Sequence, residues 1–92
     1  MKMSVSAELL DAVKTASSLT SDYAAAPVIG VSQQMLSQVR QNRSHFSPEK
    51  VLFLCELSDL DAVDWLLRWH RERAKCDKEK AVFDQVLTRL AS

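Results

Sequence analysis

The single glycine of the chain, Gly30, lies between two short stretches whose apolar residues have helical spacing. A residue that ends one helix and redirects the chain sharply needs a positive φ, which glycine adopts without steric cost. Ala26, four residues earlier, is small enough to let two helices cross closely. Ser32 is suited to cap the second helix by accepting a hydrogen bond from the backbone N–H of Met35. The sequence therefore predicts two short helices joined by a tight turn.

The second helix of this pair is predicted to have an apolar side and a polar, uncharged side. The apolar positions have the spacing of a shared core: Ile29, Val31, Leu36 and Val39. The side chains left pointing outward are related by steps of three and four residues: Gln33, Gln34, Ser37, Gln38 and Gln41. Taken alone, a glutamine-rich helical face is more often merely solvated than functional.

The segment 21–41 resembles the helix-turn-helix of lambdoid phage repressors and Cro proteins. The positions that match the usual pattern of that family are Ala26, Gly30, Val31, Ser32, Gln33, Gln34, Leu36, Ser37 and Val39. A helical layout extends the resemblance more loosely over residues 9 to 75. The resemblance implies that helix 32–41 enters the major groove of DNA and that its outward side chains touch base edges. A glutamine amide agrees with that role, because its donor and acceptor match the N6 and N7 edge of adenine. The expected base-contacting residues are Gln33, Gln34, Ser37 and Gln38.

Three positions depart from the family pattern. Pro27 lies within the first helix of the motif, where it removes a backbone hydrogen bond and is expected to kink or shorten the helix. Asp22 stands where the family often has a phosphate-contacting glutamine; a carboxylate repels phosphate, although it suits a helix N-terminus. Asn42 and Arg43 stand where the family usually has asparagine followed by glycine at the end of the second helix. Asparagine tolerates the left-handed conformation that ends a helix.

The charge balance counts against nucleic-acid binding, because the formal net charge is zero and phosphate attraction usually leaves a basic signature. The distribution of charge is more favourable. Residues 31–50 carry a local cationic excess, whereas acids gather at Asp59, Asp61 and Asp64. We expect modest, salt-sensitive affinity per monomer. The expected phosphate-contacting residues are Ser32, Arg40, Gln41, Arg43, Ser44 and His45.

The rest of the chain reads as further helices. Ser6 is predicted to cap a first helix, and Ser47 followed by Pro48 is a strong start signal for a helix that ends near Ser58. Ser58 is then predicted to cap a longer helix, and Asp77 to open the last one. The fold class expected is all-α: a single domain over residues 1–92, lambda-repressor-like, with five to six helices including an extra C-terminal one.

The last two helices, residues 59–91, are candidates for dimerisation. Apolar residues at 83, 86, 87 and 90 have the spacing of a helix that packs on another helix, and aromatic residues dominate cores and interfaces alike. The stripe either closes the core of its own monomer or forms part of a dimer interface, and both can hold. Regulators of the phage type bind paired half-sites, so a twofold homodimer is expected. The candidate interface residues are Trp65, Trp69, Phe83 and Leu87.

Other classes of function find little support in the sequence. Cys55 and Cys76 show no metal-binding spacing, so no zinc site or other metal is expected; Cys55 should be buried and Cys76 exposed. His70 is not placed to activate Cys76, and one glycine cannot build a phosphate-cradling loop. We therefore expect no enzyme, no cofactor and no small-molecule substrate. Apolar runs are too short for a membrane span, so a soluble, cytoplasmic protein is expected.

These observations predict a sequence-specific DNA-binding transcriptional regulator, a repressor of phage or mobile-element type. One alternative within DNA binding is an excisionase or other architectural factor that bends DNA. Another, from a different class, is a protein-binding adaptor of the antirepressor or antitoxin-like kind. In that case the helix-turn-helix would be a scaffold, and the surface around Trp65 and Trp69 would bind a protein.

Overall fold

The computed structural model describes residues 3 to 91, and within them it contains helices and no strand. The all-α prediction is confirmed. Residues 1, 2 and 92 of the predicted 1–92 domain lie outside the described part. The helices are α1 (Val5–Ala16), α2 (Asp22–Ile29), α3 (Gln33–Arg40), α4 (Pro48–Ser58), α5 (Ala62–Arg73) and α6 (Asp77–Ala91).

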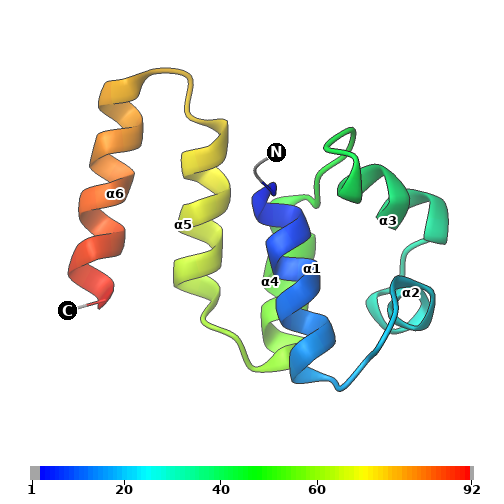
Figure 1. Cartoon of the computed structure of the whole chain (residues 1–92). Coiled ribbons are helices and arrows are strands. Elements are labelled where there is room, and N and C mark those ends of the chain that lie inside the picture. Colours follow the sequence, from blue (N-terminus) through cyan, green and yellow to red (C-terminus); the bar gives the residue numbers. More distant parts are fainter. Residues whose placement is uncertain (1–2, 92) are drawn as a thin grey trace.

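Helix α1 lies at the centre of the arrangement, where it contacts α3, α4 and α5 (Figure 1). Helices α2 and α3 pack on each other at one side of the molecule, and α6 lies at the opposite side against α5. The principal dimensions are 38 × 26 × 23 Å. The long dimension therefore runs from the α2–α3 pair to α6.

The buried core is supplied by the first four helices and the segment between α3 and α4. It includes Ile29, Leu36 and Val39, as the sequence predicts. Helix α5 adds partly buried side chains, among them Trp65, Leu66 and Trp69, whereas no residue of α6 is fully buried. Helix α6 therefore packs on α5 without contributing a fully buried residue to the core. The other core side chains are Ala7, Leu9, Leu10, Val13, Ala25, Ala26, Phe46, Val51, Leu54 and Cys55.

Most of the local start and stop signals are confirmed. Gly30 ends α2 in the left-handed conformation with φ 82°, and Asn42 follows α3 with φ 59°. The hydroxyl of Ser32 accepts a hydrogen bond from Met35 N at 3.0 Å. The hydroxyl of Ser47 caps α4 in the same way.

The predicted caps of the first and fifth helices are wrong. Ser4 caps α1 by accepting from Ala7 N at 3.1 Å, whereas the buried hydroxyl of Ser6 accepts from Phe46 N at 3.0 Å. Asp61 caps α5, because its Oδ1 accepts hydrogen bonds from the backbone N–H groups of Val63 and Asp64. Ser58 lies in the last turn of α4, and its buried hydroxyl has no partner among the described residues.

Pro27 does not confine α2 to its last turns, because the helix runs continuously from Asp22 to Ile29 with the proline inside it. The missing N–H would have paired with the carbonyl of Tyr23, four residues earlier. Tyr23 and Pro27 are both exposed, so solvent can satisfy that carbonyl. Helix α2 therefore accommodates the proline on its exposed face.

We expect Gly30→Val to lower the free energy of unfolding by more than about 1 kcal/mol, because a β-branched residue is strained at this positive φ. The nearest atom to a β-carbon built at Gly30 is Lys50 Nζ at 3.8 Å, so the penalty is backbone strain and not a clash. Gly30→Asn is the matched control and should cost less, since asparagine tolerates the left-handed region. Urea unfolding of both variants measures the difference. Equal stability of Gly30→Val and wild type would contradict the turn assignment.

Candidate nucleic-acid interface

The turn between α2 and α3 is fixed by hydrogen bonds from both sides. The backbone N–H groups of Gly30 and Val31 both donate to the carbonyl of Ala26, at 2.9 and 3.1 Å. From α4, Lys50 Nζ donates to the carbonyl of Ile29 at 3.2 Å. A cation at the C-terminal end of a helix is favourable because it meets the negative end of the helix dipole. Lys50 therefore ties α2 to α4.

The predicted base-contacting side chains lie on the outer face of α3. Gln33, Gln34 and Ser37 are exposed, and Gln38 is half-buried. Gln41 is exposed at the C-cap, where its amide Nε2 lies 3.4 Å from Ser37 Oγ. Helix α3 forms the outer edge of the molecule on this side (Figure 1). One helix thus presents a continuous set of uncharged hydrogen-bonding groups to solvent.

The C-terminal end of α3 is held by an ion-pair network that joins three helices. The guanidinium of Arg40 donates to Asp11 Oδ1 of α1 at 2.7 Å and to both carboxylate oxygens of Asp22 in α2 at 2.9 Å. Lys14 Nζ lies 3.0 Å from the same Asp22 carboxylate. Hydrogen bonds from Arg40 lower the pKa of Asp22 from 3.8 to about 2, while Asp22 and Asp11 raise the pKa of Arg40. The Asp22 carboxylate therefore stays ionised, and its negative charge is balanced by Arg40 and Lys14.

The predicted phosphate-contacting residues differ in how far their side chains are already engaged. Arg40 is occupied by its two carboxylates. Arg43 is exposed and forms no ion pair with any residue from 3 to 91. Ser44 Oγ donates to Met35 Sδ at 3.3 Å, and His45 Nδ1 lies 3.8 Å from Glu72 Oε1. Ser32, at the opposite end of α3, uses its hydroxyl oxygen as the helix cap.

The predicted dimer residues pack within the chain itself. Trp69 Nε1 donates to the carbonyl of Phe46 at 2.7 Å, and the Arg73 guanidinium lies 4.1 Å from the ring centroid of Trp69. The ring of Phe83 stacks on His70 with centroids 6.4 Å apart. Trp65 packs partly against the core, and Leu87 is half-buried. More exposed apolar side chains lie elsewhere, at Leu52, Phe53, Leu57, Val63, Val82 and Leu90.

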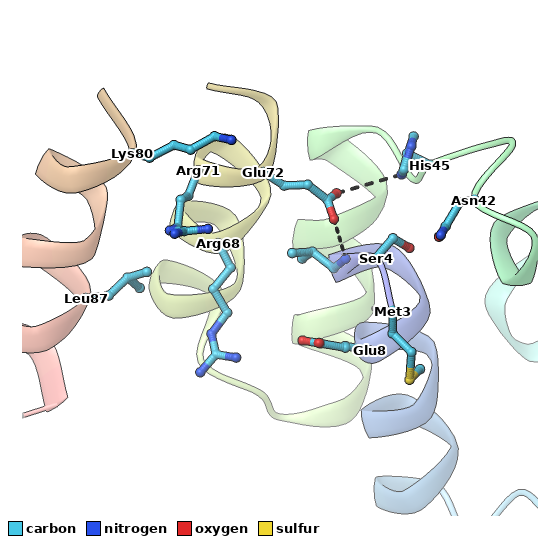
Figure 2. A pocket seen from close by; sticks show the side chains of 11 residues that line it. Met3, Ser4, Glu8, Asn42, His45, Arg68, Arg71, Glu72, Lys80 and Leu87 are labelled. Carbon is cyan, nitrogen blue, oxygen red and sulfur yellow. Dashed lines mark hydrogen bonds and ion pairs between the residues drawn. The ribbon is translucent and has the colours of Figure 1, made fainter. Parts of the chain in front are cut away.

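An open groove of about 570 Å³ lies between the start of α1, the α3–α4 segment and the α5–α6 pair (Figure 2). Glu72 reaches from α5 into this region, where Oε2 accepts from Val5 N at 2.7 Å and Oε1 faces His45. Asn42 and His45 lie at one side of the groove, and Lys80 lies on α6 at the other. Residues from distant segments meet here, so no local sequence pattern indicated the groove.

Within the described chain, no group of three His, Cys, Asp or Glu side chains could hold a metal ion. Cys55 is buried and Cys76 is exposed, as predicted. Burial raises the pKa of the Cys55 thiol, which keeps it in the less reactive protonated form. None of the helices in residues 3–91 is long and apolar enough to cross a membrane.

Comparison of the chain with protein-family models, with curated proteins and with solved structures found no match. The chemistry of the α2–α3 surface therefore has to be inferred from its own residues and geometry.

We expect Asp22→Asn to lower the free energy of unfolding at pH 7 by about 1 kcal/mol after allowance for solvent screening of the ion pair. The Asp22 pKa is lower in the folded protein, so the stabilisation is complete above about pH 3.8 and is lost as the pH falls toward 2. Denaturant unfolding at several pH values should show wild type and variant converging over that range. A stability difference that does not change between pH 7 and pH 2 would contradict the proposed charge pairing.

Proposed function

We propose that the protein is a sequence-specific DNA-binding transcriptional regulator, a repressor of phage or mobile-element type. In this proposal α2 and α3 form a lambda-repressor-like helix-turn-helix, and α3 enters the major groove. The observation that carries the proposal is the exposed, uncharged glutamine face of α3, presented behind a glycine turn at φ 82°. The resemblance of segment 21–41 to the repressor and Cro motif supports the same role.

The dimensions and chemistry of α3 suit the major groove. An α-helix with its side chains is about 10–12 Å across, which fits the roughly 12 Å width of the groove. Gln33, Gln34 and Gln38 can each pair two hydrogen bonds with an adenine edge, and Ser37 can donate to or accept from either base type. Because these groups carry no charge, they add discrimination between sequences more than general attraction to DNA.

Most of the phosphate contacts in this proposal lie at the C-terminal end of α3. Arg43 is exposed and unpaired within the described chain, and Gln41, Ser44 and His45 lie beside it. Ser32 supplies the start of α3, where backbone N–H groups favour a phosphate. Arg40 serves the same surface indirectly, because its ion pairs with α1 and α2 hold the helix in place.

The working form we propose is a homodimer on paired half-sites. A neutral monomer with a few uncharged base contacts falls short of the roughly 10⁻⁸ M affinity typical of specific sites. A second copy doubles the base and phosphate contacts. Exposed Val82 and Leu90 on α6 offer apolar area within the predicted segment 59–91.

Two other functions are alternatives to this proposal. An excisionase or DNA-bending factor would use the same α3 surface but distort the duplex on binding. A protein-binding adaptor of the antirepressor or antitoxin-like kind is favoured by the exposed apolar residues of α4, namely Leu52, Phe53 and Leu57. Salt-dependent binding to duplex DNA distinguishes the adaptor from the other two, since only phosphate contacts release counterions.

We expect Gln33→Ala to lose about 1–3 kcal/mol of discrimination at one base position, because it removes one bidentate base contact. Arg43→Ala should weaken binding to all duplexes alike and flatten the salt slope by about one unit. Selection from random duplexes by the wild-type protein supplies the preferred site, and fluorescence anisotropy measures both variants on it. If both bind that site like wild type, α3 is not the recognition surface.

We expect the wild-type protein to sediment as a dimer at tens of micromolar, and Val82→Glu with Leu90→Glu to sediment as a folded monomer. Both side chains are more than half exposed, so the charges should cost dimer contacts without unfolding the chain. Circular dichroism checks the fold, and analytical ultracentrifugation measures the mass. A wild-type monomer that protects a single asymmetric DNA site would refute the dimer, and a dimeric double variant would refute its placement on α6.

A further inference from the structure

A second cationic surface lies at the corner where α5 meets α6. Figure 1 shows this corner at the same end of the molecule as the segment between α3 and α4. Residues 71–80 contain five cationic side chains against three acidic ones. We call three lysines of this segment the basic corner: Lys75 and Lys78, which are exposed, and Lys80, which is half-buried at the groove.

The three lysines of the basic corner are available to an external anion. Lys75 and Lys78 are exposed, Lys80 borders the groove, and none of them forms an ion pair within the described residues. The neighbouring arginines differ, because Arg71 pairs with Asp84 and Arg73 pairs with Glu72. Asp77 and Glu79 lie in the first turn of α6, where the helix dipole already favours their charge.

The groove connects the basic corner with the expected DNA contacts of the α3–α4 segment. Asn42 and His45 border one side of it, and Arg71 and Lys80 border the other (Figure 2). The opposite end of the molecule has the reverse charge. The segment from Glu56 to Asp64 contains four acids and no lysine or arginine.

We propose that the basic corner contacts the phosphate backbone of the duplex that flanks the site bound by α3. This inference rests on the proposed DNA-binding function and extends it, since it assigns a backbone contact to helices outside the helix-turn-helix. The long dimension of the molecule is 38 Å, which corresponds to about 11 base pairs of B-DNA. A duplex can therefore reach both surfaces of one monomer.

The charge pattern favours a polyanion along the corner over a small anion inside the groove. Glu8 and Glu72 border the groove and repel an anion that enters it. The groove arginines, Arg68 and Arg71, already pair with Asp64 and Asp84. Lys75 and Lys78 are exposed outside the groove, and lysine ammonium groups suit backbone phosphates because they carry charge without base preference.

The assignment also gives α6 a role. The helix buries none of its residues fully and packs on α5, so the core of the domain does not require it. Its first turn carries the exposed Lys78, three residues after Lys75 in the chain, and places Lys80 at the groove.

The test uses the full chain and a random-sequence duplex of about 24 base pairs, with affinity measured by fluorescence anisotropy between about 50 and 200 mM NaCl. The variant is Lys75→Gln with Lys78→Gln. The control is Arg89→Gln, which removes a charge from the exposed opposite end of the same helix. Circular dichroism confirms that each variant is folded.

We expect the double lysine variant to lose nearly two units of salt slope, so that its affinity falls about twelve-fold less than that of wild type over this salt range. Arg89→Gln should keep the wild-type slope. An unchanged slope in the lysine variant, with a reduced slope in Arg43→Ala, would overturn the basic corner while leaving the proposed function intact. An equal loss in Arg89→Gln would show a general charge effect and would also overturn it. If wild type shows no salt-dependent binding to duplex DNA, the proposed function fails and the inference fails with it.

Discussion

The guanidinium of Arg40 is the contact on which the outer surface of α3 depends. It joins the end of α3 to Asp11 in α1 and Asp22 in α2, with hydrogen bonds of 2.7 to 2.9 Å. A half-buried ion pair contributes little net stability when its desolvation is counted. Its bidentate geometry is directional, however, because a planar guanidinium meets a carboxylate in one orientation. The network therefore fixes the position of α3 more than it stabilises the fold.

Other long-range polar contacts fix the segment that follows α3. The backbone N–H of Phe46 donates to the buried Ser6 hydroxyl, and the Phe46 carbonyl accepts from Trp69 Nε1. Phe46 itself is buried, so a residue of the segment between α3 and α4 links α1 to α5. The exposed side chains of α3 and Arg43 thus project from a backbone that is fixed by contacts with α1, α2 and α5. Their freedom to meet a ligand does not require a mobile scaffold.

The features that the sequence predicted correctly depend on interactions over three or four residues. Gly30, Ser32 and Ser47 act through a single turn of backbone, so their neighbours in the chain determine their roles. The two wrong caps show where this local logic ends. Ser6 was as good a local candidate as Ser4, but its hydroxyl is taken by Phe46, forty residues away. Ser58 does not cap α5 because α4 continues through it and ends at Asp59, which adopts φ 54°. The backbone N–H of Leu60 then donates to the Cys55 carbonyl. With this helix ending, the cap of the next helix falls at Asp61.

The candidate site divides in the same way. The outward face of α3 follows from helical periodicity, and its exposure was predictable. The partners of Arg40 were not, because Asp11 and Asp22 lie 29 and 18 residues away. The groove beside Glu72 combines separate segments of the chain and was invisible to any pattern of spacing. The position of a residue on a helix face could be inferred from sequence. The partner of its charged side chain could be identified only from the folded structure.

The neutral charge of the whole chain fits the complex with DNA that we propose. In that proposed complex, an uncharged face on α3 gives little attraction to nonspecific duplex, so binding energy there depends on matched bases. Arg43 lies in the chain between Asn42 and His45, which border one side of the groove, and Lys80 of the basic corner borders the other side. The acids from 56 to 64 lie at the far end. A zero net charge with separated ends gives no overall attraction but a preferred orientation in the field of a duplex. In the proposed complex, sequence discrimination therefore arises at the centre of the contact and is weakly salt-dependent, while the salt dependence arises at its edges.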